Sequence, residues 1–208
     1  MEYQVTVVMA LVDYLPVLCF GIAALLLMKD FYGKMGLGVF LCFAAGMADV
    51  FIAGFCKASW KLLYAAGVCD FQSLNSLFLP LQSIGFLLAG IGMLIYVLRT
   101  RALKDGGEPK ALALVPPVFS GSFVFIGMMV LGLGAVCAGL SILAKRKKRV
   151  AAIVLFALCF TFSLCMGYLS SRDSTSAVVN WIEESVNCCG QACLLIGVIL
   201  LRKKEQAA

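Results

Sequence analysis

Six long apolar runs dominate the sequence. Each has about 20 residues, which is long enough for a helix to cross a hydrocarbon layer of roughly 30 Å. Hydrophobic residues make up 62% of the 208 residues, and this share is far above that of soluble domains. The sequence therefore predicts an all-α polytopic membrane protein with six transmembrane helices. The expected helices are residues 5–28, 35–56, 76–98, 122–144, 150–170 and 176–201.

Short matches between the two halves of the chain indicate an internal repeat. Leu18-Cys19-Phe20-Gly21 resembles Val136-Cys137-Ala138-Gly139, and Leu41-Cys42-Phe43 resembles Leu158-Cys159-Phe160. In the third helix of each half, Asn75, Gln82 and Ile91-Gly92 correspond to Asn180, Asn187 and Ile196-Gly197. The matches keep their order along the chain, which favours a repeat. Chance matches in a sequence rich in Leu, Cys and Phe are the alternative.

We interpret the chain as two three-helix units. The first unit is residues 1–98, the second is residues 122–208, and residues 99–121 form a linker with a short interfacial segment. A three-helix unit ends on the opposite side of the membrane from its start. Two such units that follow each other directly must therefore be inverted relative to each other. We expect two inverted three-helix repeats.

The basic residues lie mainly in the connectors between apolar runs. If successive helices alternate in direction, ten basic residues lie on the side of the N-terminus and seven on the other side. The positive-inside rule then favours a multi-pass protein of the cell membrane with both termini in the cytoplasm. The expected partners are the lipid bilayer and anionic lipid headgroups, and no nucleic acid. A homodimer or a partner membrane subunit is a further option.

Residue types that many enzymes require are missing. The chain has no histidine, which excludes histidine-dependent catalysis and haem ligation. The ten cysteines lie mostly in apolar runs and are expected to pack as small hydrophobic residues. No nucleophile elbow, phosphate loop or dinucleotide fingerprint occurs. We therefore expect no enzyme activity, no cofactor and no metal site.

Four carboxylates lie within the apolar runs. Asp13, Asp49 and Glu184 each lie within about 6 Å of the middle of an expected helix, and Glu183 precedes Glu184. No lysine or arginine is expected in the middle of a span to neutralise them. Buried acids of this kind must be protonated, hydrated or bound to a cation, so they are candidates for a proton or cation site. Alternatively, the two glutamates lie at headgroup level and Asp49 bonds to a neighbouring helix.

Polar residues at helical spacing form a stripe in the last apolar run. Asn180, Glu184, Asn187 and Gln191 are four, three and four residues apart and so share one helix face. The candidate substrate-binding residues are this stripe together with Asn75 and Gln82 of the third run. Such amides either line a central cavity or hold helices together through hydrogen bonds of about 0.6–2 kcal/mol each.

From these features we expect a protein that transports or captures a small polar or cationic solute through a central polar cavity, with proton coupling as an option. The alternative is a non-transporting sensor or assembly module, whose intramembrane polar residues only hold helices together. In size and number of spans the chain is similar to the substrate-binding subunits of vitamin importers, but it shares no motif with them.

Overall fold

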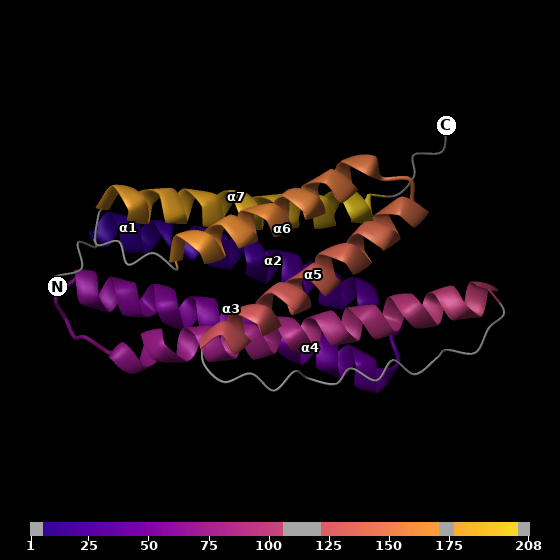
Figure 1. Ribbon diagram of the computed structural model, residues 1–208, viewed down its shortest axis with the longest axis horizontal. Helices are drawn as coiled ribbons and strands as arrows, with labels where there is room; N and C mark the ends of the chain where they lie inside the picture. Colours follow the sequence, from indigo (N-terminus) through magenta and orange to yellow (C-terminus); the bar gives the residue numbers. More distant parts are fainter. Residues whose placement is uncertain (1–5, 106–121, 171–176, 204–208) are drawn as a thin grey trace.

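The fold is a bundle of helices, shown in a computed structural model that describes residues 6–105, 122–170 and 177–203. Six helical stretches in these residues are long and apolar enough to cross a membrane, which confirms the predicted all-α, six-helix architecture. Large apolar side chains remain exposed on the outside of the bundle, as expected for a surface that faces lipid. The helices are α1 (Val7–Val12), α2 (Tyr14–Phe31), α3 (Leu37–Ala65), α4 (Gln72–Asp105), α5 (Ser122–Arg146), α6 (Val150–Ser170) and α7 (Ala177–Arg202) (Figure 1).

The first crossing stretch consists of two helices, α1 and α2, which meet at Asp13. Pro16 explains the interruption, because proline has no N–H to bond to the carbonyl of Val12, four residues earlier. The acidic side chain therefore lies where the helical hydrogen-bonding pattern is broken.

Helix α3 is longer than the sequence analysis predicted. We expected a helix that ends at residue 56, but α3 continues without a break to Ala65. No glycine or proline interrupts residues 57–66, and the helix ends where Gly67 adopts a positive φ of 68°. The Val68 N–H then bonds to the Leu63 carbonyl, as in a Schellman cap. Lys57 and Lys61 therefore belong to a helix that can cross the membrane.

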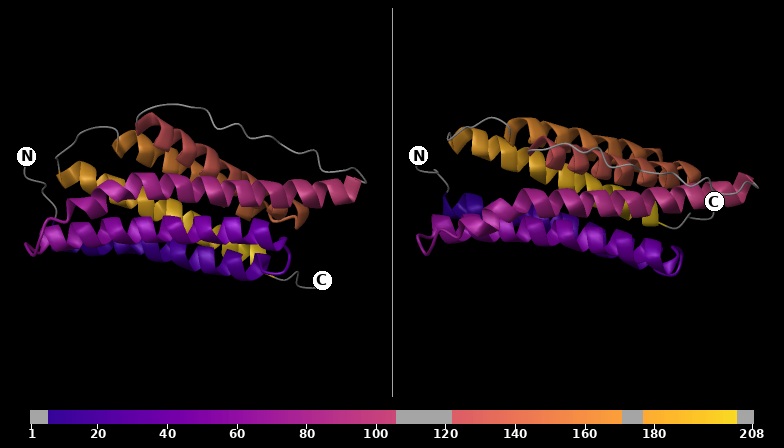
Figure 2. Two further views of the ribbon diagram at one scale, coloured as in Figure 1. Left: turned by 90° about the horizontal axis from the view of Figure 1, so that it is seen from below. Right: turned by 60° about the horizontal axis from the view of Figure 1, so that its bottom comes forward.

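The helices form a closed ring. Each helix from α2 to α7 packs against the next one in the chain, and α7 packs against α2 (Figure 2). Glycines allow the closest approaches between neighbours. A Cβ at Gly85 would lie 2.9 Å from the Gly46 carbonyl oxygen, and a Cβ at Gly90 would lie 2.6 Å from the Gly132 carbonyl oxygen. Helix α4 thus touches both α3 and α5 through backbone atoms.

Helices α4 and α5 run parallel. Gly90 lies against Gly132, and Gly139 lies against Met93. Farther along, Arg146 Nη1 donates a hydrogen bond of 2.9 Å to Thr100 Oγ1. Residue numbers therefore rise together along the two helices, as Figure 1 shows. Asp105 and Ser122, which the chain joins through residues 106–121, lie at opposite ends of the bundle.

The course of these helices bears on three predictions. The second unit, α5 to α7, has the same orientation as the first, so the expected inverted repeat is not found. Residues 99–105 continue α4 rather than forming the start of a linker, and the expected interfacial segment lies outside the described residues. The start of α1 and the end of α7 also lie at opposite ends of the bundle (Figure 1). This arrangement does not agree with our expectation that both termini face the cytoplasm.

A glycine–phenylalanine contact occurs at a similar place in each of the two units. Gly92 on α4 lies against Phe43 on α3, and Gly197 on α7 lies against Phe156 on α6. Gly92 and Gly197 are the glycines matched in the sequence, 105 positions apart, whereas Phe43 and Phe156 are 113 apart rather than the 117 of the matched Phe43 and Phe160. The difference of four residues is about one helical turn. These contacts are consistent with two units related by a two-fold axis along the bundle.

Positive charge collects at one end of the bundle, which we call the basic end. It is formed by the α2–α3 and α5–α6 connections and by the C-terminal ends of α4 and α7. The opposite end, which we call the site end, carries only Lys57 and Lys61 among the described residues. The described basic residues at the basic end are Lys29, Lys34, Arg99, Arg101, Lys104, Lys145, Arg146, Lys147, Lys148, Arg149, Arg202 and Lys203.

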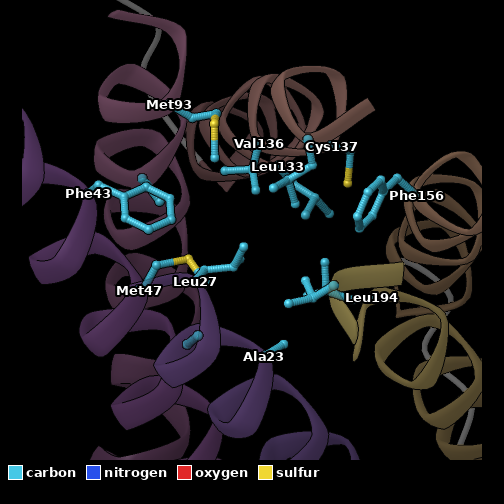
Figure 3. Close-up of a cluster of buried hydrophobic side chains, with 14 of the residues drawn as sticks. Ala23, Leu27, Phe43, Met47, Met93, Leu133, Val136, Cys137, Phe156 and Leu194 are labelled. Carbon is cyan, nitrogen blue, oxygen red and sulfur yellow. The ribbon is translucent and has the colours of Figure 1, made fainter. Parts of the chain in front are cut away.

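A layer of apolar side chains fills the middle of the ring. Figure 3 shows side chains from all six long helices pointing toward one another. Leu27, Met93 and Leu194 are almost completely buried there. The labelled members of the layer are Ala23, Leu27, Phe43, Met47, Met93, Leu133, Val136, Cys137, Phe156 and Leu194.

The parallel packing predicts which loops share a membrane side. Single cysteines introduced as Lys34→Cys and Lys148→Cys, in a background without the native thiols, should react with a membrane-impermeant reagent from the same side. Restoring the exposed native Cys69 alone should place a reactive thiol on the other side. Labelling of positions 34 and 148 from opposite sides would instead show strict alternation of the six helices.

Candidate functional site

The ring encloses a cavity of about 240 Å³. Residues from all six long helices line it, and most of them are apolar. The cavity lies between the site end and the buried apolar layer, and it shares Leu133 with that layer. Its aromatic lining residues are Phe20, Phe51, Phe78, Phe86, Phe160 and Phe162.

Five of the nine predicted site residues meet at this cavity. Asp13, Gln82, Glu184, Asn187 and Gln191 come from the α1–α2 junction, α4 and α7. These residues are far apart in the sequence, so the fold itself creates the cluster. Three of the four stripe residues on α7, Glu184, Asn187 and Gln191, therefore face the interior of the ring.

The other four predicted residues do not line the cavity. Asn75, Asn180 and Glu183 are partly buried outside its lining. Asp49 is next to Val50, which does line the cavity, but a helix turns by about 100° per residue. Asp49 is only partly buried, and its neighbour Ala48 is exposed, so this carboxylate does not join the acids at the site.

Lys61 connects the two buried acids. Its Nζ lies 2.9 Å from Asp13 Oδ2 and also forms an ion pair and hydrogen bond with Glu184 Oε1. The exposed fractions of the three side chains are 16% for Lys61, 9% for Asp13 and 3% for Glu184. The ion pairs join α3 to the α1–α2 junction and to α7. The expectation that no basic side chain within a span neutralises these acids was therefore wrong.

Lys57 is the second basic residue that the sequence analysis missed. It lines the cavity, and its Nζ lies 4.1 Å from the centre of the Phe78 ring. No described carboxylate lies within ion-pair distance of it. A contact with an aromatic face stabilises an ammonium less than a well-placed anion would. Lys57 can therefore accept an anionic partner.

A sequence signal for both lysines was present. Val50, Gly54, Lys57 and Lys61 are four, three and four residues apart, the same spacing as the stripe on α7. They share one helix face, and the first three line the cavity. The signal was missed because the helix was expected to end before Lys57.

Two buried acceptor atoms at the cavity have no hydrogen-bond partner among the described residues. These atoms are Glu184 Oε2 and Gln191 Oε1, and both residues line the cavity. The buried Asn180 Nδ2 also has no partner, but Asn180 lies outside the lining. An unsatisfied buried polar atom costs about 1–3 kcal/mol. Unpaired acceptors in a cavity wall are suited to a ligand that brings hydrogen-bond donors.

Contacts around the last turns of α3 hold Lys61 in position. The hydroxyls of Tyr14 and Ser59 form a hydrogen bond of 2.9 Å between the start of α2 and α3. Trp60 Nε1 donates a hydrogen bond of 2.9 Å to Asp70 Oδ1 in the connection to α4. Trp60 also stacks on Tyr64, with their ring centres 5.8 Å apart. Ser59 and Trp60, which directly precede Lys61 in this turn, are thus held by hydrogen bonds to other parts of the chain.

Comparison of the chain with known protein families, with characterised proteins and with solved structures gives no match. Within residues 6–105, 122–170 and 177–203, no three cysteine or acidic side chains come together as metal ligands.

Removing Lys61 should destabilise the protein strongly. Lys61→Met leaves two buried carboxylates without a counter-charge, and the free energy of unfolding should fall by about 3–5 kcal/mol. Asp13→Asn and Glu184→Gln in the same chain should restore most of this loss. Unfolding of the purified protein in detergent measures the effect, with the exposed Lys34→Met as control. A loss of less than 1 kcal/mol would contradict a central role for these ion pairs.

Proposed function

We propose that this protein captures or transports a small solute that binds in the cavity enclosed by α2 to α7. The main support is the set of unsatisfied polar groups in the cavity wall, Glu184 Oε2, Gln191 Oε1 and the Lys57 ammonium. Polar groups within an apolar bundle are costly, and they are retained more readily where they serve a ligand. The same pattern would be disadvantageous in a bundle that only has to pack.

The charge distribution supports a direction for this capture. We propose that the protein spans the cell membrane several times with the basic end toward the cytoplasm. The positive-inside rule favours this orientation, because twelve of the described basic residues lie at that end. The site end and the N-terminus then face away from the cytoplasm. The apolar layer in Figure 3 lies between the cavity and the cytoplasm. On this proposal the solute enters from outside, and transport requires the layer to open.

The ion pairs of Lys61 remove the main reason to expect a cationic solute or proton coupling. We expected a polar or cationic solute, with proton coupling as an option, because the buried acids had no evident counter-charge. Lys57 and Lys61 together balance Asp13 and Glu184 in formal charge. The proposal therefore does not need a bound metal cation or a proton to keep this cluster neutral.

Filling the cavity should abolish function, whereas an equal change on the outer surface should not. Val130 lines the cavity, and its neighbour Leu131 is 63% exposed on the outside of α5. In proteoliposomes supplied with a panel of amino acids, vitamins and monovalent cations, at least one solute should bind or be taken up. Val130→Trp should reduce this activity at least tenfold, and Leu131→Trp should leave it unchanged. Equal activity of both variants would exclude the cavity as the binding site.

The alternative function, a structural module without transport, predicts the opposite effect of Gln191 on stability. If Gln191 serves a ligand, then Gln191→Leu removes an unpaired buried acceptor and should raise the free energy of unfolding by about 1 kcal/mol. If its amide holds helices together, the same substitution should lower this free energy. Unfolding in detergent without added solute distinguishes the two, with the exposed Gln72→Leu as control.

A further inference from the structure

The unsatisfied groups of the cavity differ in chemical character. Glu184 Oε2 and Gln191 Oε1 accept hydrogen bonds, whereas the Lys57 ammonium donates them and carries positive charge. A ligand that satisfies all three must carry both a donor group and an anionic or strongly accepting group. A simple cation or a simple anion satisfies only part of the set.

The formal charges around the cavity favour a ligand without net charge. Asp13 and Glu184 are balanced by Lys57 and Lys61. An additional net charge would stay uncompensated in a region of low dielectric constant, which is costly. A zwitterion adds one charge of each sign and leaves the total at zero.

The positions of the groups along the helices set the order in which they meet a ligand. Lys57 precedes Lys61 by four residues, so its backbone lies about 6 Å deeper along α3 than that of Lys61, which pairs with Glu184. Gln191 follows Glu184 by seven residues and lies about 10 Å deeper along α7. Glu184 and Lys57 can thus hold the two charges of a small zwitterionic head. Gln191 lies deeper, beside the body of the ligand.

The rest of the cavity suits an aromatic body. Six phenylalanines from four helices line it, and aromatic rings pack well against one another in offset or edge-to-face geometry. A volume of about 240 Å³ is below that of most sites for drug-sized ligands, which are roughly 300–1,000 Å³. The body must therefore be small.

We propose that the cavity binds a small aromatic zwitterion of the amino acid type. Its ammonium group binds Glu184 Oε2, its carboxylate binds the Lys57 ammonium, and its ring packs among the phenylalanines. A donor on the ring, such as an indole N–H, binds Gln191 Oε1. This proposal rests on the proposed function of the cavity and specifies its ligand.

A series of indole compounds tests the proposal with the full chain in lipid nanodiscs. The probes are L-tryptophan, tryptamine without the carboxylate, and indole-3-propionate without the amine. L-Tryptophan should bind at least tenfold more tightly than either of the other two, as measured by calorimetry. L-Phenylalanine, which has no donor on its ring, should bind more weakly than L-tryptophan.

Variants assign each group of the ligand to a residue. Lys57→Met should make the affinities for L-tryptophan and tryptamine equal, and Lys57→Arg should restore the preference for L-tryptophan. Gln191→Leu should remove the preference for L-tryptophan over L-phenylalanine. These readouts are ratios of affinities, so a general loss of stability does not reproduce them.

The outcomes separate this inference from the proposed function. If tryptamine binds the unmodified protein as tightly as L-tryptophan does, the zwitterion proposal is wrong. If no indole compound binds but another solute is taken up in a way that Val130→Trp abolishes, the ligand class is wrong and the proposed function stands. If no solute of the panel binds or is taken up, both proposals fail.

Discussion

The compensation of buried charge is the constraint on which the rest of the structure depends. Asp13 and Glu184 lie inside a bundle that is mostly apolar, where an unpaired carboxylate is very costly. Lys61 reaches both acids from a third helix and thereby joins α3, α7 and the α1–α2 junction. Because one side chain balances two acids, the second lysine, Lys57, remains without an ion pair among the described residues and faces the cavity. The site proposed to bind a solute thus depends on the way these charges are shared.

The direction of the helices determines where this site lies. Since α5 runs parallel to α4, the two three-helix units have the same orientation and close into one ring. The same packing gathers twelve of the described basic residues at one end and the buried ion pairs toward the other. Between them, the apolar layer of Figure 3 separates the cavity from the basic end. The proposed capture of a solute from the site end depends on this separation.

Much of the architecture could be predicted from local patterns. Helix α6 occupies the predicted residues, and the spacing of Glu184, Asn187 and Gln191 correctly indicated a polar face toward the interior. The helical continuation past Cys56 was missed because two lysines and a tryptophan resemble the end of a span. That error concealed Lys57 and Lys61 and left the acids without an evident counter-charge. Asp49 is among the predicted site residues because the depth of a side chain along a helix can be read from the sequence. Whether that side chain faces lipid or the interior depends on the neighbouring helices.

The sequence by itself determined the six apolar helices and the polar stripe on α7, because hydrophobic length and helical spacing are properties of contiguous residues. Only the tertiary structure decided that α4 and α5 run parallel, that Lys61 pairs with Asp13 and Glu184, and that Asn75 and Asn180 lie outside the cavity lining. These outcomes depend on how the faces of distant helices fit together, and close glycine contacts such as Gly90 with Gly132 fix that fit. The packing of distant surfaces cannot be read from the spacing of residues along one helix.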